Sequence, residues 1–473
     1  MRMVDVAVIG AGPAGATLAT ICARNGLDVA LYEREPGARY RVGESLLPAT
    51  PRYVAPLLGV ETRIAHANFV VKPGATFCWG RSPDRPWNLL FGGPDAGPGA
   101  PTALNVEREC FDAILLDNAA ARGVEVLRGH TVVSVEDGDS VGGREVEVRA
   151  STGGACHRVR ARYVANASGQ VRLKVPKLDA RTHSRFFRKV AVWGYWDGGA
   201  RLDPPLQGNV LFETLATEHG PAWAWFIPLS RGRTSVGVVA PRACAGALSR
   251  DRRAKLRAWL SQCPRTVGLL AEARASTEPP YDVVRVRADY SYASDAFWAP
   301  GLVQVGDAAC FVDVLLSSGV HLATYGALLA ARSIEAVLSG QLPEMLAMNE
   351  YESRLRQEFA IFYAGLNGLY DMTRSRDDYI EPLRNLLRSS NGVLMEWDQS
   401  PDAAGGLNRE RAVAARDDPG LEAASNQRVM SAFNLAQLLD DGRPRGVPVT
   451  ELPAVRNTLT ASPDGRGWRL PWS

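Results

Sequence analysis

The chain opens with a pattern of apolar and polar positions that is typical of an α/β protein. Residues 4–9 form a short, almost continuously apolar run, as expected of a buried parallel strand. Residues 16–24 read as a helix, and residues 29–33 form a second apolar run that ends in an acid. A strand, a helix and a second strand in this order predict the start of a doubly wound unit.

Further along the chain, the pattern predicts more strands and then helices. Residues 223–229 and 235–239 read as two strands joined by an Arg-Gly-Arg turn, which predicts a hairpin. Residues 301–306 predict another strand, and Gly306 and Asp307 at its end are expected to open a helix, because Asp is a good N-cap. Residues 351–370 carry apolar and aromatic side chains at helical spacing.

Composition and charge exclude several classes of protein. The 473 residues are 46% hydrophobic and 22% charged, with a net charge of +3 that is too small to argue for nucleic-acid binding. No apolar run approaches the roughly 18 residues of a membrane span, and no signal-peptide pattern is seen, so a cytoplasmic protein is expected. The seven cysteines and six histidines are scattered without metal-ligand spacing, so no metal site is expected.

The first motif with chemical meaning is the glycine-rich turn GAGPAG at residues 10–15. Gly10 allows the tight turn, Gly12 lets a pyrophosphate approach the backbone, and Gly15 lets helix and strand pack closely, with Ala14 in the same turn. The N-terminus of the following helix presents free N–H groups to phosphates. Glu33, at the end of the second strand, is placed to bind ribose hydroxyls. These features predict a dinucleotide site, with a structural turn as the alternative.

The glycine motif alone does not separate FAD from NAD, but downstream segments resemble the FAD-dependent monooxygenase superfamily. The resemblance implies that Asp307 holds ribityl or ribose hydroxyls of FAD. Residues 105–112 resemble that superfamily's strand-to-helix arginine segment, which implies that Arg108 contacts the flavin; a surface arginine is the alternative. Residues 162–169 resemble a strand-end turn that usually carries an acid, and here Asn166 replaces it.

Two further motifs bear on what the flavin would do. Lys72 lies in the run FVVKPGATFCWG at residues 69–80, and Trp223 and Trp225 lie in the run WAWFIP at residues 223–228. Tryptophans at positions i and i+2 of a strand share one face. A surface lysine and a large core patch are the plain interpretations. The co-occurrence of the two runs with a flavin motif resembles the flavin-dependent halogenases, and this resemblance extends from end to end of the chain.

The resemblance implies roles for particular residues. Lys72 aligns with the family's essential lysine, and the two tryptophans fill the space beside the flavin where a hydroxylase would admit its substrate. The run GESLLP at residues 43–48 matches a loop over the flavin, which implies cofactor contacts for residues in and just before it: Arg41, Glu44 and Ser45.

The same resemblance points to a halide site. Ser317, Ser318 and Gly319 match the place where chloride binds beside the flavin, and N–H groups at a helix start suit an anion. An ordinary helix cap is the alternative. Val314 stands where the family usually has proline, and Leu316 where it usually has an aromatic residue.

The implied reaction uses FAD in its reduced form, FADH2, together with oxygen and chloride. A flavin C4a-hydroperoxide gives hypochlorous acid, which Lys72 relays to an aromatic ring. No NADPH site is evident, so a separate flavin reductase is expected to supply FADH2. The closest resemblance is to glycopeptide-antibiotic halogenases that act on tyrosyl groups held on a peptidyl carrier protein, through residues 42–50, 289–292, 320–332 and 460–468. The alternatives are an aromatic hydroxylase and an inactive flavin-binding assembly partner.

The implied fold is α/β: a monooxygenase-like doubly wound FAD-binding domain, a β-sheet substrate domain and a C-terminal helical region. We expect residues 1–340 to form the FAD-binding module, in which segments of about 70–100 and 175–285 make the substrate-side sheet. Residues 341–473 are expected to be mostly helical. The polar stretch of about 375–445, with its Pro and Gly breaks, is expected to be partly mobile.

Overall fold

The structure is a computed structural model that describes most of the chain. It covers residues 2–37, 40–92, 100–137, 143–151, 154, 156–171, 173, 178, 180–249, 251–379, 460–461 and 468–469. The expectations for residues 380–445, and those for most of residues 460–468, therefore lie outside the described residues.

One layer is a mostly parallel sheet with the strand order β19-β20-β10-β1-β2-β7. Its strands are β1 (Arg2–Ile9), β2 (Val29–Glu33), β7 (Glu125–Arg128), β10 (Cys156–Asn166), β19 (Trp298–Ala299) and β20 (Leu302–Gln304), and β10 is extended by β9 (Arg144–Ala150), which pairs β8 (His130–Asp137). Because β1 pairs in parallel with both β2 and β10, helix α1 (Pro13–Arg24) makes the crossover from β1 to β2. The predicted doubly wound start is confirmed.

The second layer is a largely antiparallel sheet with the order β16-β12-β15-β14-β13-β4-β5. Its strands are β4 (Gly74–Cys78), β5 (Trp87–Leu90), β12 (Lys189–Asp197), β13 (Val210–Thr217), β14 (Gly220–Pro228), β15 (Arg233–Pro241) and β16 (Arg274–Ala275), with β17 (Arg285–Ala288) beside β12. The predicted hairpin is confirmed, since β14 pairs β15 across a turn at Arg231, whose φ is +52°.

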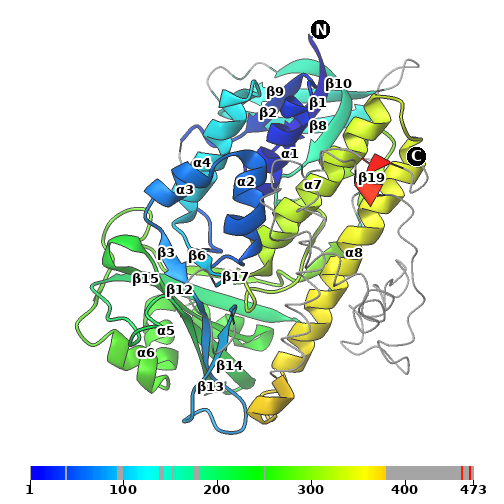
Figure 1. The fold of residues 1–473 in the computed structure, drawn as a ribbon. Helices are drawn as coiled ribbons and strands as arrows, with labels where there is room; N and C mark the ends of the chain where they lie inside the picture. Colours follow the sequence, from blue (N-terminus) through cyan, green and yellow to red (C-terminus); the bar gives the residue numbers. More distant parts are fainter. Residues whose placement is uncertain are drawn as a thin grey trace, which may run out of the picture.

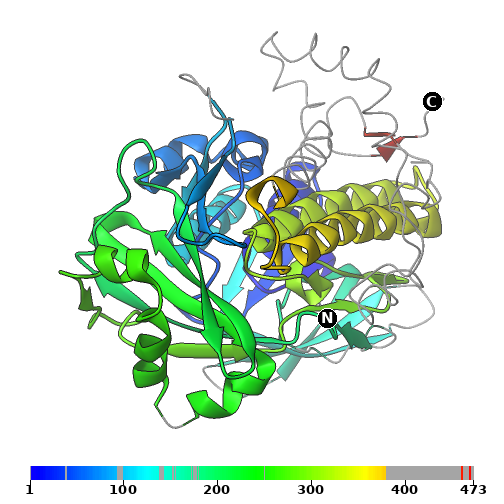
Figure 2. The ribbon, with the colours of Figure 1, turned by 90° about the horizontal axis from the view of Figure 1, so that it is seen from below.

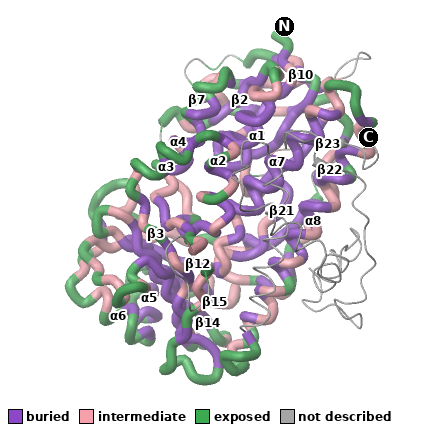
Figure 3. Tube along the Cα trace, in the orientation of Figure 1, coloured by how far each residue is buried: buried purple, intermediate pink, exposed green. Residues whose placement is uncertain are grey.

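Helices pack beside these sheets (Figure 1). They are α2 (Ala55–Leu58), α3 (Glu61–His66), α4 (Arg108–Ala121), α5 (Arg252–Leu260), α6 (Pro264–Leu269), α7 (Ser318–Leu338) and α8 (Glu344–Leu369), preceded by a π-helical turn at Thr50–Val54. Figure 2 shows α7 and α8 running side by side. The tube in Figure 3 is buried along β1, α1 and α7 and along the central strands of the second sheet. Helix α8 confirms the helical spacing of residues 351–370.

Short strands connect the two layers. These strands are β3 (Val70–Lys72) paired with β6 (Ala103–Asn105), and β11 (Arg181–His183) and β21 (Cys310–Phe311) on either side of β18 (Tyr292–Ser294); β22 (Thr460–Ala461) pairs β23 (Trp468–Arg469). In the described part of the chain, no helix combines the length and the apolar character that crossing a membrane would require.

Two predictions about elements were wrong. Gly306 and Asp307 do not open a long helix: they form a single 3-10 turn, Gly306–Ala308, because the chain then pairs as β21 with β18, and α7 begins only at Ser318. The segment 175–285 is not strands throughout, since it contains α5 and α6. Two signals could have found these helices: the side chain of Asp251, which caps α5, and Pro264 at the start of α6.

A glycine makes room for tryptophans in the second sheet. Gly237 of β15 lies opposite Trp193 of β12 on one side and Trp225 of β14 on the other. A Cβ atom at residue 237 would lie 2.3 Å from the Trp225 ring and 2.6 Å from Cβ of Trp193. The absence of a side chain at residue 237 therefore lets two large rings share one face of the sheet.

We expect Gly237→Ala to lower the free energy of unfolding by about 1–3 kcal/mol, because the added methyl overpacks a buried site. Chemical denaturation of the purified protein measures this difference. Gly268→Ala in α6 is the matched control, since a Cβ there has no neighbour within 4 Å and alanine favours a helix. Equal stabilities for the two variants would contradict the packing argument.

Candidate active site

The glycine-rich turn between β1 and α1 is shaped for close backbone packing. Gly10 has a φ of +102°, and a Cβ there would lie 2.4 Å from the carbonyl oxygen of Ala167. A Cβ at Gly15 would lie 1.9 Å from the carbonyl oxygen of Gly10. Gly12 is the extended residue that precedes α1, and Ala14 is buried in the helix's first turn. The turn therefore needs glycine at positions 10 and 15, as predicted.

The acid at the end of β2 lies at this turn. Glu33 is buried, and its Oε2 accepts a hydrogen bond of 2.9 Å from the backbone N–H of Ala11. No side chain of the described residues caps the start of α1, so its first N–H groups are free to bind an anion. An uncapped helix start beside a buried carboxylate fits the pyrophosphate and ribose of a dinucleotide.

Arg108 lies at the junction of β6 and α4 and holds the loop that precedes residue 44. Its guanidinium forms a bidentate pair with Asp112, at 2.9 and 3.1 Å, and donates to the carbonyl of Val42 at 2.9 Å. Arg41 instead donates to the carbonyl of its neighbour Tyr40. The structure thus brings the Arg108 guanidinium onto the backbone of residues 42 and 43.

Glu44 is the buried end of a hydrogen-bonded chain of phenols. The hydroxyl of Tyr195 on β12 donates to Glu44, and the hydroxyls of Tyr195 and Tyr40 lie 2.6 Å apart. The indole of Trp193 donates to Tyr40 at 2.6 Å. Burial raises the pKa of Glu44, although the Tyr195 hydrogen bond opposes that shift. Sequence reasoning missed both tyrosines, because residues 40 and 195 meet only in the folded chain.

Asn166 is the last residue of β10, and Asp307 lies in the 3-10 turn that follows the neighbouring parallel strand β20. The Asp307 carboxylate accepts from Nε2 of Gln170 at 3.3 Å, and burial raises its pKa to about 6. The Asn166 side-chain oxygen accepts from the backbone N–H of Ser168 at 3.2 Å. Asparagine therefore supports the strand-end turn by hydrogen bonding without a charge.

Lys72 is buried where the loop after β2, strand β3 and the start of α7 meet. It is 3% exposed, so the surface-lysine interpretation is wrong. Its Nζ donates to the carbonyl of Leu46 at 3.0 Å and lies 3.4 Å from Oγ of Ser317, which is 3.0 Å from Oγ of Ser45. The ammonium group also lies 5.2 Å from the centre of the Phe91 ring. Three predicted site residues, 45, 72 and 317, thus form one hydrogen-bonded group.

Burial also changes the acid–base chemistry of Lys72. It lowers the pKa of the ammonium group to about 7, because the charged form loses its hydration. Both the ammonium and the free amine are therefore accessible near neutral pH, and the amine is a nucleophile.

The predicted halide residues lie at the start of α7. Ser317 precedes the helix with a left-handed backbone, φ +57°, and Ser318 and Gly319 begin its first turn. Gly319 packs under Phe311, since a Cβ there would lie 3.0 Å from that ring. Val314 and Leu316, the departures from the family pattern, are both half-buried beside this turn.

The two tryptophans of β14, Trp223 and Trp225, form a buried aromatic surface that we call the tryptophan wall. Trp223 and Trp225 are buried, with ring centres 6.1 Å apart. The Trp225 indole donates to Oγ of Ser235 at 3.3 Å, and the Trp223 indole donates to the hydroxyl of Tyr370 at 3.0 Å. The shared face predicted from their spacing is confirmed, and Tyr370 is a partner that the sequence did not indicate.

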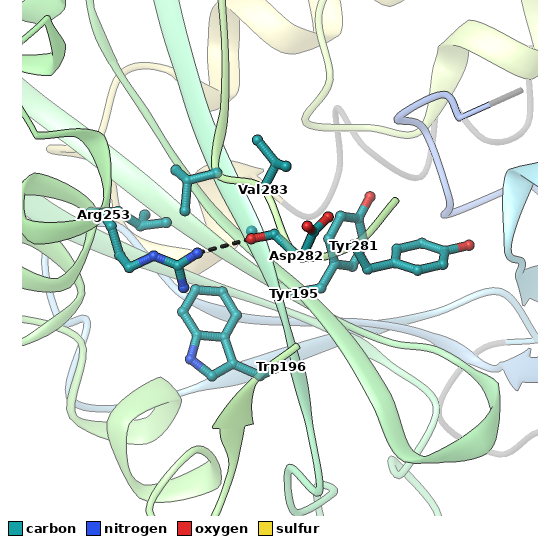
Figure 4. A pocket seen from close by; sticks show the side chains of 9 residues that line it. Tyr195, Trp196, Arg253, Tyr281, Asp282 and Val283 are labelled. Carbon is teal, nitrogen blue, oxygen red and sulfur yellow. Dashed lines mark hydrogen bonds between the residues drawn. The ribbon is translucent and has the colours of Figure 1, made fainter. Parts of the chain in front are cut away.

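A small pocket elsewhere is lined by neither Lys72 nor the two tryptophans of β14 (Figure 4). It lies between β12, α5 and residues 281–284, where Arg253 donates to the carbonyl of Asp282 at 2.9 Å. Tyr195, the partner of Glu44, also borders it, but Lys72 and the two tryptophans of β14 do not. It is therefore not the pocket in which the predicted chemistry would occur.

Comparison with known proteins identifies the family. The pattern of the family described as "Tryptophan halogenase" matches residues 5–98 and 94–384. A flavin-dependent halogenase of Armillaria mellea is 33% identical over 80% of this chain and 73% of its own length, and the tryptophan 2-halogenase of Chondromyces crocatus is 31% identical over 82% and 72%. Among solved structures, that of the myxobacterial chondrochloren halogenase CndH, an FAD-dependent halogenase, superposes with a TM-score of 0.78. The two sequences are 36% identical, and the match covers 99% of this chain and 100% of that one.

The burial of Lys72 predicts a pH-dependent stability. Its pKa in the folded protein, about 7, lies below its ordinary value of 10.5, so between these values the unfolded chain binds one more proton than the folded chain. The free energy of unfolding should therefore rise with pH in this window, by about 1.4 kcal/mol per pH unit from this group. Lys72→Met keeps the apolar stem and removes the titration. Denaturation of both flavin-free proteins between about pH 7.5 and 9 measures the difference, and parallel pH profiles would contradict the burial.

Proposed function

This chain belongs to the tryptophan halogenase family and is a flavin-dependent halogenase with an α/β FAD-binding fold; from that premise we propose that it chlorinates a phenolic ring through Lys72. The observation that carries this proposal is the burial of the Lys72 amine between the loop that contains Ser45 and Leu46 and the start of α7. Lys72 forms no ion pair with a carboxylate of the described residues, and its pKa is about 7; these are the properties of a reactive group.

The residues around the glycine turn would hold the cofactor. The start of α1 would bind the pyrophosphate of FAD, Glu33 the ribose hydroxyls, and Asp307 the flavin side of the molecule. Arg108 and Glu44 would fix the loop over the flavin through the contacts they already make. When bound and reduced, by electrons that a separate flavin reductase supplies, the flavin activates oxygen so that chloride is converted to hypochlorous acid.

The chain's own residues then control that small oxidant. The N–H groups at the start of α7, at Ser318 and Gly319, suit a chloride ion, and the left-handed Ser317 turns its hydroxyl towards Lys72. The tryptophan wall is proposed to close the space through which a hydroxylase would admit its substrate. These groups position the oxidant and exclude water, which limits its loss.

Lys72 can pass the halogen on in two ways. The ammonium form can donate a hydrogen bond to hypochlorous acid and hold it for attack by the ring. The amine form can react with hypochlorous acid to give a chloramine and water, after which the ring takes the chlorine and a ring proton returns the nitrogen to an amine. A pKa of about 7 makes both forms available, so both routes remain open.

The substrate is proposed to be a tyrosyl-type phenol presented on a peptidyl carrier protein, as part of antibiotic biosynthesis. Support comes from the sequence resemblance to glycopeptide-type halogenases and from the net charge of +3, since carrier proteins dock through acidic surfaces. The arginine-rich stretches at residues 409–411 and 443–445 that would contribute to docking lie outside the described residues. A phenol that is not held on a carrier protein is the second candidate, because two relatives are named for small molecules, tryptophan and sulochrin.

Lys72→Ala should reduce chlorination by more than about 100-fold, the loss expected when a group that acts directly on the reacting atoms is removed. FAD content and flavin oxidation by oxygen should persist, because Lys72 lies outside the glycine turn. Mass spectrometry of the product, with flavin reductase and chloride present, measures the chlorine or oxygen gained. Lys255→Ala, which removes a lysine paired with Glu218, is the control. Near wild-type chlorination by Lys72→Ala would remove the relay from the mechanism.

Turnover of tyrosyl-carrier protein should exceed turnover of free tyrosine, and only the carrier reaction should weaken as salt rises. Charges on exposed docking surfaces are screened beyond about 8–10 Å at physiological ionic strength, whereas a small neutral phenol gains little from them. Parallel assays at low and high salt make the comparison. Equal rates without salt dependence would leave a free-phenol halogenase.

A further inference from the structure

The last turn of α8 brings a hydroxyl between two parts of the candidate site. Tyr370 follows the last residue of α8, and its hydroxyl accepts from the Trp223 indole at 3.0 Å. The same hydroxyl lies 3.1 Å from each carboxylate oxygen of Asp313, to which it donates. One phenol therefore joins the tryptophan wall of β14 to the segment that leads into α7.

Asp313 in turn shapes that segment. It is 0% exposed, and its Oδ1 accepts from the backbone N–H of Leu315 at 3.0 Å, a local turn that a carboxylate favours. Its carbonyl oxygen lies 3.5 Å from Oγ of Ser318. The carboxylate thus holds the turn at Leu315, three residues before α7. The neighbouring Val314 stands where the family resemblance would place a proline, and it cannot preset the turn. The left-handed Ser317 is the last residue of this segment.

Groups from two other segments, residues 187–189 and Tyr290, face the Asp313–Tyr370 pair. Lys189 of β12 places its ammonium group 4.7 Å from the centre of the Tyr370 ring, and the charge of Asp313 opposes the lowering of the lysine's pKa by burial. Burial, with the nearby carboxylate, raises the pKa of the Tyr290 phenol, and Phe187 packs on Tyr370 at 5.2 Å. Burial raises the pKa of Asp313 to about 6, and the Tyr370 hydrogen bond and Lys189 oppose that shift. The carboxylate is therefore ionised at neutral pH.

We propose that Tyr370 is a positioning residue of the halide site: its hydroxyl ties Asp313 to the Trp223 indole and so holds the turn that presents the start of α7 to the halide. This inference rests on the proposed function for the choice of α7 as the halide site. It gives the end of α8 a role in positioning the halide site, which the sequence motifs did not indicate.

The end of α8 is anchored independently of this hydroxyl, which makes the inference testable. The indole of Trp79 donates to the carbonyl of Leu369 at 2.8 Å, and the backbone N–H of Arg81 donates to the carbonyl of Arg374 at 2.9 Å. Tyr370→Phe should therefore keep the helix end and the ring in place and remove only the hydroxyl.

The test compares Tyr370→Phe with Tyr363→Phe. Tyr363 is also a buried phenol of α8, and its hydroxyl lies 2.6 Å from Oγ of Ser184, away from Asp313. We expect Tyr370→Phe to raise the KM for chloride about tenfold, the effect of losing one or two buried hydrogen bonds, and to lower the chlorinated product formed per flavin oxidised. FAD content and the rate of flavin oxidation should match those of Tyr363→Phe.

A pH profile provides a readout that a purely structural role would not change. Because the Tyr370 hydroxyl lowers the pKa of Asp313, its removal should raise that pKa, and the acid limb of chlorination should move to higher pH. Asp313→Asn keeps a hydrogen-bond acceptor and removes the charge, so it should abolish that acid limb and also change the KM for chloride. It is the second variant if Tyr370→Phe does not fold.

The inference is overturned if Tyr370→Phe, or Asp313→Asn where the first variant does not fold, has the chloride KM, product yield and acid limb of Tyr363→Phe. Failure of the proposed function would be recognised separately, because the wild type would then yield no chlorinated product or Lys72→Ala would retain full activity. A raised chloride KM together with a shifted acid limb supports the inference.

Discussion

The structure depends on keeping an amine out of water. Lys72 loses the hydration of its charge and receives in return a backbone carbonyl, a serine hydroxyl and the face of an aromatic ring. Those partners come from three distant segments: the loop of residues 43–48, the start of α7 and Phe91, which follows β5. The burial of Lys72, which ends strand β3, therefore depends on contacts with all three. The energetic cost of that burial is met by the large apolar core that connects the two sheets.

Local patterns were sufficient to predict much of the fold. The β1-α1-β2 unit, the β14–β15 hairpin and helix α8 each follow from periodicity and turn residues within one short stretch. The failures have physical reasons. Asp307 is a good cap by type, but the chain after it joins β18 as a strand, so tertiary pairing overrides the local preference. The arginine-rich helix α5 is short, so its signals are few: the capping aspartate, and Leu256, Trp259 and Leu260 at helical spacing on its buried face.

The residues of the candidate site also divide into those that the sequence predicted and those that it did not. Gly10 was predicted from the glycine-rich turn between a strand and a helix, whereas Lys72 and Ser317 were predicted because the family resemblance implied them. Their partners were not, since Tyr195, Asp313 and Tyr370 act through contacts between segments far apart in the sequence. The hydroxyl of Tyr370 and the carboxylate of Asp313 are 57 residues apart in the chain. No spacing rule for a helix or strand predicts such a pair, and nothing in the residues next to Asp313 indicates its role.

The glycine beneath the tryptophan wall has a consequence for how such a wall can change over evolutionary time. Trp193 and Trp225 both occupy the space that a side chain at position 237 would fill, so the three positions form one volume shared among three strands. Substitutions within a shared volume are not additive. A smaller ring at 225 leaves a void that a larger residue at 237 can refill, while either change alone is costly. Positions 193, 225 and 237 are therefore expected to covary among relatives, and a new opening in this part of the sheet would arise through paired replacements.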